Sequence, residues 1–208
     1  MAAELIFYTN PMSRAQIVRW MLEEVGEPYD DVQLEYGSTM KADEYLAINP
    51  MGKVPAIRHD GKVVTEAAAI CAYLAEAFPA AGLAPEPDER ADYYRWLFFA
   101  AGPVEQAITN RSVLGSSPTS EQERMVGYGN YDRVVDVLDG ALTGRDFVCG
   151  RRFTAADVYV GATVDWGLQF GTLPDRATFQ SYAARLRERD AYRRAKEIDR
   201  ALMPERSS

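Results

Sequence analysis

Residues 49–64 read Asn-Pro-Met-Gly-Lys-Val-Pro-Ala-Ile-Arg-His-Asp-Gly-Lys-Val-Val. Two apolar stretches, one beginning at Val54 and one ending at Val64, flank the dipeptide Asp60-Gly61, which favours the tight turn of a β-hairpin. Asn49-Pro50 ends any helix before it, because a residue that precedes proline disfavours helical backbone. The stretch therefore predicts a helix followed by two adjacent antiparallel strands.

His59 lies in this turn and is the only histidine of the chain. Its charged and glycine neighbours predict a solvated side chain without a chemical role. One histidine excludes a metal site built from several histidines, and any Ser-His-Asp triad would have to use this residue. We expect neither a metal nor histidine chemistry.

The chain on both sides of the hairpin alternates strand and helix signals. Between residues 13 and 26, apolar side chains recur every third or fourth position, as on one face of a helix, and a glycine ends the pattern. The expected elements in chain order are a strand at 5–8, a helix at 13–26, a strand at 31–34, a helix at 41–48, strands at 54–57 and 62–64, and a helix at 65–78.

The second half shows no strand alternation, and a Pro/Ala/Gly-rich segment, 79–87, separates it from the first. We expect a helix capped by Asp88 and kinked or broken at Gly102-Pro103, and another over 120–142. The arginine-rich segment 185–206 is interspersed with acids and predicts a solvated helix face.

Phe153-Thr154-Ala155-Ala156-Asp157-Val158 carries the strongest helix-start signal of the second half. Thr154 would cap the helix, and Asp157, three residues later, would complete a capping box. The following segment, 158–170, is apolar nearly all round and predicts a central buried helix. The expected organisation is an α/β domain over 1–80, a linker over 81–87 and an all-helical domain over 88–208.

Composition excludes several classes of protein. The chain has 208 residues, 47% of them hydrophobic, and its 23 basic and 31 acidic side chains give a net charge of -8. A nucleic-acid-binding protein usually carries the opposite charge balance, and no apolar run is long enough to cross a membrane. Cys71 and Cys149 are too far apart in sequence for a Cys-x-x-Cys redox pair, and no signal-peptide pattern is present, so a cytoplasmic location is expected.

Four segments, taken in order, resemble the soluble glutathione transferases over essentially the whole chain. They are Phe7-Tyr8-Thr9-Asn10-Pro11-Met12-Ser13-Arg14, Asn49–Ala56, Thr65-Glu66-Ala67-Ala68-Ala69-Ile70 and the capping box at 153–157. The Asn-Pro-Met-Ser-Arg motif is similar to those of theta-like and bacterial beta-like members. The resemblance implies a thioredoxin-like domain followed by a helical bundle, a homodimer, and glutathione as co-substrate in a detoxification reaction.

By this resemblance, Pro55 is a cis-proline that turns the backbone of Val54 toward the cysteinyl part of glutathione. Glu66 and the N–H of Ala67 would meet the γ-glutamyl end at a helix N-terminus, which suits a carboxylate. The family commonly has serine where this chain has Ala67, so one hydrogen bond, worth about 1.5–3 kcal/mol to a charged group, is missing. Lys53 and Lys41 are candidates for binding the glycyl carboxylate.

The chemistry requires a donor that stabilises the glutathione thiolate. Lowering a thiol pKa from about 8.5 to about 6.5 takes about 2.7 kcal/mol, which one hydrogen bond at a helix start supplies. Ser13 is the leading donor, since it stands where related bacterial enzymes place cysteine. The amide of Asn10, the phenol of Tyr8 and backbone N–H groups remain alternatives, and Ser13 can also serve as a plain helix cap.

Serine in place of cysteine favours attack by glutathione on an electrophile over thiol-disulfide exchange. The reaction could be conjugation, dehalogenation, ether cleavage or peroxide reduction. A small hydrophobic electrophile is expected between the domains, with candidate lining residues Met12, Tyr93, Trp96, Arg111 and Trp166. For each of them, packing in a core or an ordinary surface position is the more common reason for such a residue, because an aromatic side chain at helical spacing usually packs. The alternative function is a non-catalytic, glutathione-transferase-like protein that binds a ligand or partner.

Overall fold

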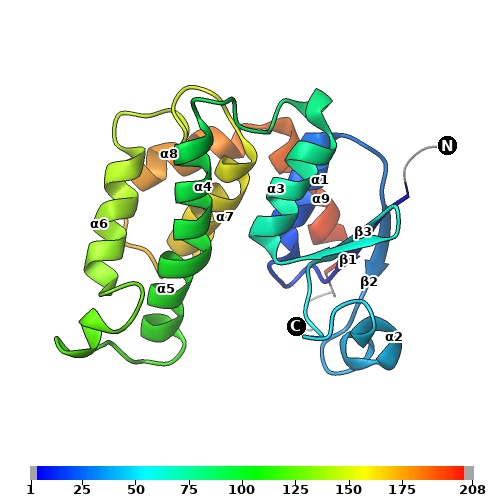
Figure 1. The fold of residues 1–208 in the computed structure, drawn as a ribbon, viewed down its shortest axis with the longest axis horizontal. Helices are drawn as coiled ribbons and strands as arrows, with labels where there is room; N and C mark the ends of the chain where they lie inside the picture. Colours follow the sequence, from blue (N-terminus) through cyan, green and yellow to red (C-terminus); the bar gives the residue numbers. More distant parts are fainter. Residues whose placement is uncertain (1–3, 204–208) are drawn as a thin grey trace. The chain divides into compact units, whose positions relative to one another are not determined.

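A computed structural model describes residues 4–203. The chain forms two compact units (Figure 1). The first combines the residues up to Leu83 with those from Glu188 onward, and the second comprises Ala84–Arg187. The division differs from the expected domains, because the C-terminal segment joins the first unit instead of the helical one.

The first unit is built on a four-stranded mixed sheet in the order β2-β1-β3-β4. The central strand β1 (Leu5–Thr9) pairs parallel with β2 (Asp30–Gln33) and antiparallel with β3 (Ala56–His59). The hairpin partner of β3 is β4 (Lys62–Thr65), with Ala56 opposite Thr65. The predicted succession of strands and helices is confirmed.

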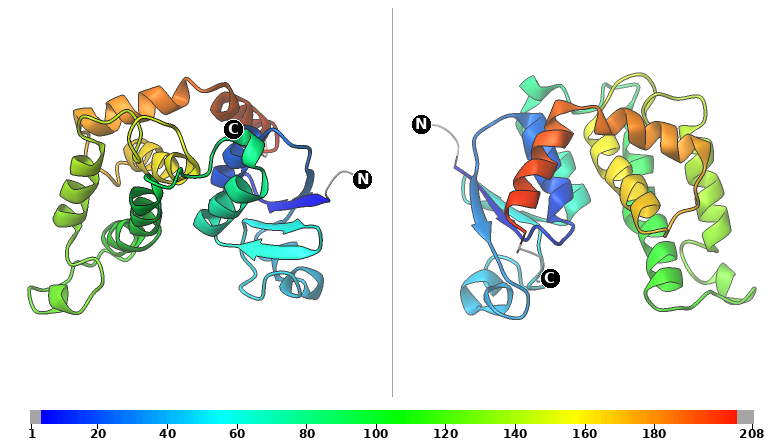
Figure 2. Two further views of the ribbon diagram at one scale, coloured as in Figure 1. Left: turned by 45° about the horizontal axis from the view of Figure 1, so that its top comes forward. Right: turned by 180° about the vertical axis from the view of Figure 1, so that it is seen from behind.

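Helices cover both faces of this sheet (Figure 2). On one face pack α1 (Ala15–Val25) and α3 (Ala67–Ala77), and on the other lie the short helices η1 (Thr39–Lys41) and α2 (Asp43–Leu46). The α2 face encloses a small core in which Tyr8 packs with four other buried side chains, Leu34, Met40, Tyr45 and Ala56. The helix predicted over 41–48 is therefore only one turn of α-helix, preceded by one turn of 3₁₀-helix.

His59 is not the solvated side chain that its turn sequence predicts. It is only 9% exposed, its Nδ1 lies 2.9 Å from the hydroxyl of Tyr73, and its ring packs on Phe78. Alternation along β3 places Ile57 and His59 on the face that α3 covers, so the register of the strand outweighs the polarity of the turn. A short 3₁₀ turn, η2 (Pro79–Ala81), follows α3.

The helix α9 (Asp190–Ala201) packs lengthwise against α1, and Figures 1 and 2 show the two side by side. Arg19 of α1 is fully buried between them, where its guanidinium binds Asp31 at 2.6 Å and Asp199 of α9 at 3.3 Å. Burial lowers the pKa of Arg19, but the hydrogen bonds to Asp31 and Tyr29 raise it by more, so the pKa lies above its ordinary value. The C-terminal helix thus docks on α1 through one face, which carries Ala191, Tyr192, Ala195 and Asp199. Arg193, Arg194 and Arg200 lie on its exposed face, as the charge pattern predicts.

The second unit is all-helical. One nearly continuous helical segment runs through α4 (Arg90–Phe99), the π-helical turn η3 (Ala100–Val104) and α5 (Glu105–Ser112). Pro103 widens the helix at η3 but does not break it, because the π-helical turn accommodates the missing N–H. The helices α7 (Ala155–Gln169) and α8 (Ala177–Arg187) pack together in the same unit.

The helix predicted over 120–142 begins eleven residues later, as α6 (Tyr131–Leu142). Asn130 caps it by accepting a hydrogen bond from the N–H of Arg133 at 2.9 Å. Gly129, with φ of 67°, separates α6 from the loop that carries the 3₁₀ turn η4 (Gln122–Arg124). A left-handed glycine followed by a capping asparagine therefore outweighs the apolar spacing upstream.

The predicted capping box at the start of α7 is confirmed. The Asp157 carboxylate is fully buried and accepts hydrogen bonds from the Thr154 N–H (2.9 Å), the Val148 N–H (2.7 Å) and the Tyr182 hydroxyl (2.8 Å). Burial raises the pKa of Asp157 to about 6, and these hydrogen bonds oppose the rise. One carboxylate thus joins the start of α7, the loop before it and α8.

We predict that replacing this carboxylate destabilises the helical unit. An Asp157→Asn side chain has one acceptor oxygen and a donor NH₂. If that oxygen keeps Val148 and Tyr182, the N–H and the hydroxyl of Thr154, which share the other carboxylate oxygen, lose their partner, at about 1–3 kcal/mol each. The free energy of unfolding should fall by about 2–4 kcal/mol in chemical denaturation monitored by circular dichroism.

The matched control is Asp146→Asn, because Asp146 is an exposed acid of the same unit, paired with Arg185 at the surface. Its change should stay below about 0.5 kcal/mol. Equal losses in the two variants would contradict a special role for the buried carboxylate.

Candidate functional site

The loop from β1 to α1 is fixed by the side chain of Asn10. Asn10 is buried, its Nδ2 donates to the Leu34 carbonyl at 2.7 Å, and its Oδ1 accepts from the Met12 N–H at 3.0 Å. The backbone carbonyl of Asn10 in turn accepts from the Ser13 N–H at 3.2 Å. The short segment 10–13 is therefore a tight, internally bonded turn at the start of α1.

Ser13 makes two hydrogen bonds with its hydroxyl. The Oγ donates to the Asn10 carbonyl at 2.7 Å and accepts from the Ala15 N–H at 3.0 Å, which caps the first turn of α1. Its side chain is partly exposed, whereas Asn10 and Tyr8 are buried. Tyr8 packs its ring 5.6 Å from that of Tyr45, inside the core beneath the sheet. Of the three candidate donors, Ser13 is the most accessible.

The segment Asn49–Ala56 forms a second loop of the same unit. The carbonyl of Lys53 accepts from the Tyr45 hydroxyl at 2.5 Å and from the Asn49 Nδ2 at 2.8 Å, and burial raises the pKa of Tyr45 to about 12. The Val54–Pro55 peptide bond is cis, as predicted. Within residues 4–203 the N–H and C=O of Val54 have no hydrogen-bond partner, so this strand-like edge is open.

Gly52 in this loop requires glycine. Its φ is 56°, and a Cβ there would lie 2.9 Å from the Met40 carbonyl oxygen and 2.9 Å from the Lys41 Nζ. The Lys41 ammonium donates to the Gly52 carbonyl at 2.7 Å. Lys41 thus holds the loop, whereas Lys53 is exposed and makes no ion pair within the described chain.

Glu66 stands at the start of α3 in an uncommon conformation. Its φ of 67° and ψ of 117° are rare for a residue with a side chain, and its carboxylate is exposed. Such strain persists only where the surrounding structure imposes it, and it is concentrated at binding sites. Ala67 follows as the first residue of the helix, whose N-terminal N–H groups favour an anion.

The candidates for binding an electrophile are placed differently within their own units. Tyr93 and Trp96 are 1% and 5% exposed and form part of the core of the helical unit, as the packing alternative predicts. Trp166 of α7 is partly exposed, Arg111 of α5 is exposed, and Met12 of the first unit is 58% exposed. Only the last three are open to a ligand.

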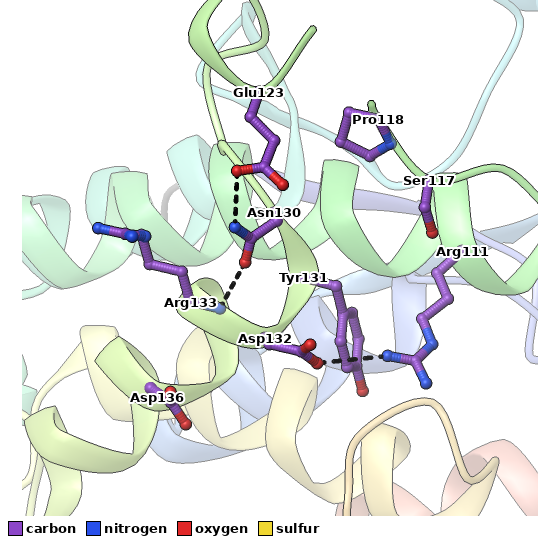
Figure 3. Close-up of a pocket in the computed structure, with 9 residues that line it drawn as sticks. All are labelled: Arg111, Ser117, Pro118, Glu123, Asn130, Tyr131, Asp132, Arg133 and Asp136. Carbon is purple, nitrogen blue, oxygen red and sulfur yellow. Dashed lines mark hydrogen bonds and ion pairs between the residues drawn. The ribbon is translucent and has the colours of Figure 1, made fainter. Parts of the chain in front are cut away.

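A cavity of about 720 Å³ lies in the helical unit where α5, the following loop and the start of α6 meet (Figure 3). Among the predicted residues, only Arg111 lines it, with its guanidinium 4.0 Å from the centre of the Tyr131 ring and 3.7 Å from Asp132. The other lining residues are mostly polar: Ser117, Pro118, Glu123, Asn130, Arg133 and Asp136. This cavity does not resemble the largely apolar pocket expected for a hydrophobic ligand.

The other reactive groups to consider are the two cysteines and the possible metal ligands of residues 4–203. Both cysteines are free; burial raises the pKa of Cys71 above its usual range and that of Cys149 to about 12. Within residues 4–203, no three His, Cys, Asp or Glu side chains are arranged to hold a metal ion. None of the helices in that range is both long and apolar enough to cross a membrane.

Sequence reasoning missed the side chains that support these loops. Gln16 donates from Nε2 to the Pro11 carbonyl at 2.6 Å, and the Tyr36 hydroxyl lies 3.4 Å from the Met12 carbonyl. Tyr45 and Asn49 fix Lys53, as described above. A polar residue in the first turn of a helix carries no local signal for such a contact.

A mixed four-stranded sheet with a cis-proline before its third strand, joined to an all-helical unit, defines a thioredoxin-like protein with a helical second domain. Family models for the glutathione S-transferase N-terminal domain and C-terminal domain match residues 11–77 and 96–185. The chain belongs to the glutathione S-transferase family.

Similar proteins agree with this assignment. The chain is 29% identical over 142 residues to glutathione S-transferase GST-4.5 of Xanthomonas campestris, and 31% identical over 127 residues to GstA of Escherichia coli O157:H7. These alignments cover 64% and 60% of this chain, and 69% and 62% of the two relatives. A glutathione transferase homologue from Sulfitobacter with bound glutathione is 26% identical, with a TM-score of 0.73 over 96% of this chain and 99% of that one.

We predict that the Asn10–Ser13 turn contributes measurably to stability. Ser13→Ala removes a helix cap and should cost about 1 kcal/mol. Asn10→Ala leaves the buried Leu34 carbonyl and the Met12 N–H without partners and should cost about 2–3 kcal/mol. Denaturant titration of both variants measures the order of these losses, and a larger loss for Ser13→Ala would contradict the assigned contacts.

Proposed function

We propose that this chain is a glutathione transferase that stabilises the glutathione thiolate for attack on a small hydrophobic electrophile. The observation that carries the proposal is a set of three accessible binding elements in the first unit. A partly exposed hydroxyl stands at the start of α1, an open backbone edge lies at Val54, and a strained acid stands at the start of α3. Each element matches a chemically distinct part of glutathione.

Ser13 is the proposed sulfur donor. Its Oγ already accepts the Ala15 N–H, and an accepted hydrogen bond polarises a hydroxyl and makes it a better donor. The hydroxyl hydrogen would turn from the Asn10 carbonyl to the sulfur, while the Ala15 bond remains. Asn10 and Tyr8 are weaker candidates for the sulfur donor, because both side chains are almost completely buried. The backbone N–H groups at the start of α1 are a further candidate.

The tripeptide would extend across the two loops and the start of α3. The N–H and C=O of Val54, next to Pro55, would pair with the cysteinyl residue as one strand pairs with another. The Glu66 carboxylate suits the γ-glutamyl ammonium, and the N–H groups from Ala67 onward suit its carboxylate. Lys53 is the preferred partner of the glycyl carboxylate, with Lys41 in a supporting role, because the Lys41 ammonium already binds Gly52.

The reaction follows from thiolate chemistry. The thiol proton leaves to solvent, and the sulfur electron pair forms a new bond to the electrophilic atom. In a substitution, the bond from that atom to the leaving group breaks and the leaving group departs with the electron pair. In an addition, the displaced electron pair moves to the neighbouring atom, which takes up a proton from solvent. Dehalogenation, ether cleavage and peroxide reduction begin with the same thiolate. Met12 is the proposed contact of the electrophile in the first unit, where it is 58% exposed. Arg111 and Trp166 are the accessible members of the predicted set within the second unit.

A non-catalytic binding protein of the same family is the second candidate. Ala67 favours it, since a serine hydroxyl at this position would supply one more hydrogen bond to the γ-glutamyl carboxylate. A cytoplasmic location suits either function, because glutathione is abundant there.

We also propose a homodimer. Tyr94 and Phe98 lie one turn apart on α4 and are 41% and 68% exposed, and paired exposed aromatic side chains are typical of protein interfaces. We propose that a second copy of this chain packs on Tyr94 and Phe98, since the family resemblance implies a homodimer.

One test of the proposed function concerns the effect of Ser13 on the pKa of bound glutathione. Glutathione bound to the wild-type protein should ionise about 2 units below its free pKa, and Ser13→Ala should abolish most of that shift. Ultraviolet thiolate absorbance, followed from acid to alkaline pH, measures both. Ser181→Ala, an exposed serine of α8, should behave as wild type.

A thiol shift that survives Ser13→Ala would move the donor role to Asn10, Tyr8 or the backbone. Failure of the wild type to bind glutathione at any workable concentration would reject the transferase and leave the binding-protein alternative.

Another test concerns the proposed homodimer. Sedimentation of the wild type should give twice the chain mass of 23.2 kDa, and Phe98→Glu should shift the equilibrium toward the monomer, because a charge would be buried at the interface. Phe170→Glu, at an equally exposed aromatic of the same unit, should remain dimeric. A monomeric wild type would contradict the proposal.

A further inference from the structure

A chain of two hydrogen bonds joins the C-terminal helix to the turn that carries Ser13. On α9, Lys196 donates from Nζ to the Gln16 Oε1 at 2.9 Å. Gln16, on the first turn of α1, donates from Nε2 to the Pro11 carbonyl at 2.6 Å. Residues 180 positions apart in sequence are thereby connected to the middle of the Asn10–Ser13 turn.

The position of Lys196 is set by the rest of the α1–α9 interface. Arg189 binds Glu24 through two hydrogen bonds of 2.6 and 2.7 Å, and the rings of Tyr192 and Trp20 meet edge to face at 5.1 Å. Residues 189, 192 and 196, at the N-cap of α9 and along it, contact residues 24, 20 and 16 of α1, in this order. The helices therefore run antiparallel, and of these three contacts the one between Lys196 and Gln16 lies nearest to the turn.

Lys196 also decides which end of the Gln16 amide faces the turn. An ammonium only donates hydrogen bonds, so it selects the amide oxygen and leaves Nε2 for the Pro11 carbonyl. A cation on the oxygen polarises the amide and strengthens the bond that Nε2 donates. The charge on α9 thus acts on the backbone two residues before Ser13.

We propose that Lys196 and Gln16 are positioning residues that hold the Asn10–Ser13 turn in the geometry in which the Ser13 hydroxyl reaches the glutathione sulfur. This inference rests on the proposed function, and it adds that the C-terminal helix takes part in thiol activation without touching glutathione. Small displacements of a donor weaken a charge-assisted hydrogen bond steeply, so loss of either residue raises the pKa of the bound thiol.

Four variants of the full chain separate this role from simple helix packing. Lys196→Met keeps the apolar stem beside Tyr192 but removes the charge and the donor. Gln16→Glu keeps the bond from Lys196 but has no hydrogen to donate to Pro11. Lys196→Arg restores a donor-only cation, and Arg194→Met removes a different α9–α1 ion pair, to Glu23 at 3.2 Å, that does not lead to the turn.

The measurement is the pKa of the bound glutathione thiol by thiolate absorbance, with the unfolding midpoint recorded for each variant. Lys196→Met and Gln16→Glu should each raise the pKa of the bound thiol by about 0.5–1 unit. At a given pH, such a rise lowers the ratio of thiolate to thiol by about three- to tenfold. Lys196→Arg and Arg194→Met should stay close to wild type.

Two results overturn the inference while the proposed function stands: an unchanged thiol pKa in Lys196→Met, or an equal rise in Arg194→Met, which would indicate general loosening of α9. A wild-type protein that binds glutathione without lowering its thiol pKa would overturn both the proposed function and this inference. The two failures are therefore distinguishable.

Discussion

The buried guanidinium of Arg19 constrains the arrangement of the first unit. A charge removed from water is tolerated only when opposite charges and hydrogen bonds replace the lost hydration. Here the replacements come from Asp31 at the edge of the sheet, Tyr29 before it and Asp199 on α9. Burial raises the pKa of Asp199, and Arg19 opposes that rise. Helix α1 therefore needs both β2 and α9 in place.

This requirement explains why the C-terminal helix belongs to the first unit. Without α9, Arg19 would lose Asp199, and Glu23 and Glu24 would lose their arginine partners. Because α1 begins at the Asn10–Ser13 turn, whatever fixes α1 also fixes the candidate site at its N-terminal end. The site is consequently built from four stretches of the first unit: the turn itself, the Val54 loop, the start of α3 and, through Gln16, the last helix.

Local signals made much of this predictable from the sequence. The Asp60-Gly61 hairpin, the cis-proline expected by resemblance and the Thr154–Asp157 capping box appear where they were expected, because each depends on a few adjacent residues. The burial of His59 and the docking of α9 were not predictable in this way. Both depend on which distant surface covers a strand face or neutralises a charge, and spacing within one segment does not encode that choice.

The chemical role proposed for Ser13 does not conflict with its structural role. A hydroxyl has one hydrogen to donate and two lone pairs to accept with. The cap on α1 uses a lone pair, through the Ala15 N–H, whereas the proposed thiolate contact uses the hydrogen. When that hydrogen turns to sulfur, the Asn10 carbonyl keeps the Ser13 N–H at 3.2 Å, so no backbone group is left without a partner. The exchange replaces a hydrogen bond to a neutral carbonyl with one to an anion, which is the stronger of the two, and the turn does not have to move.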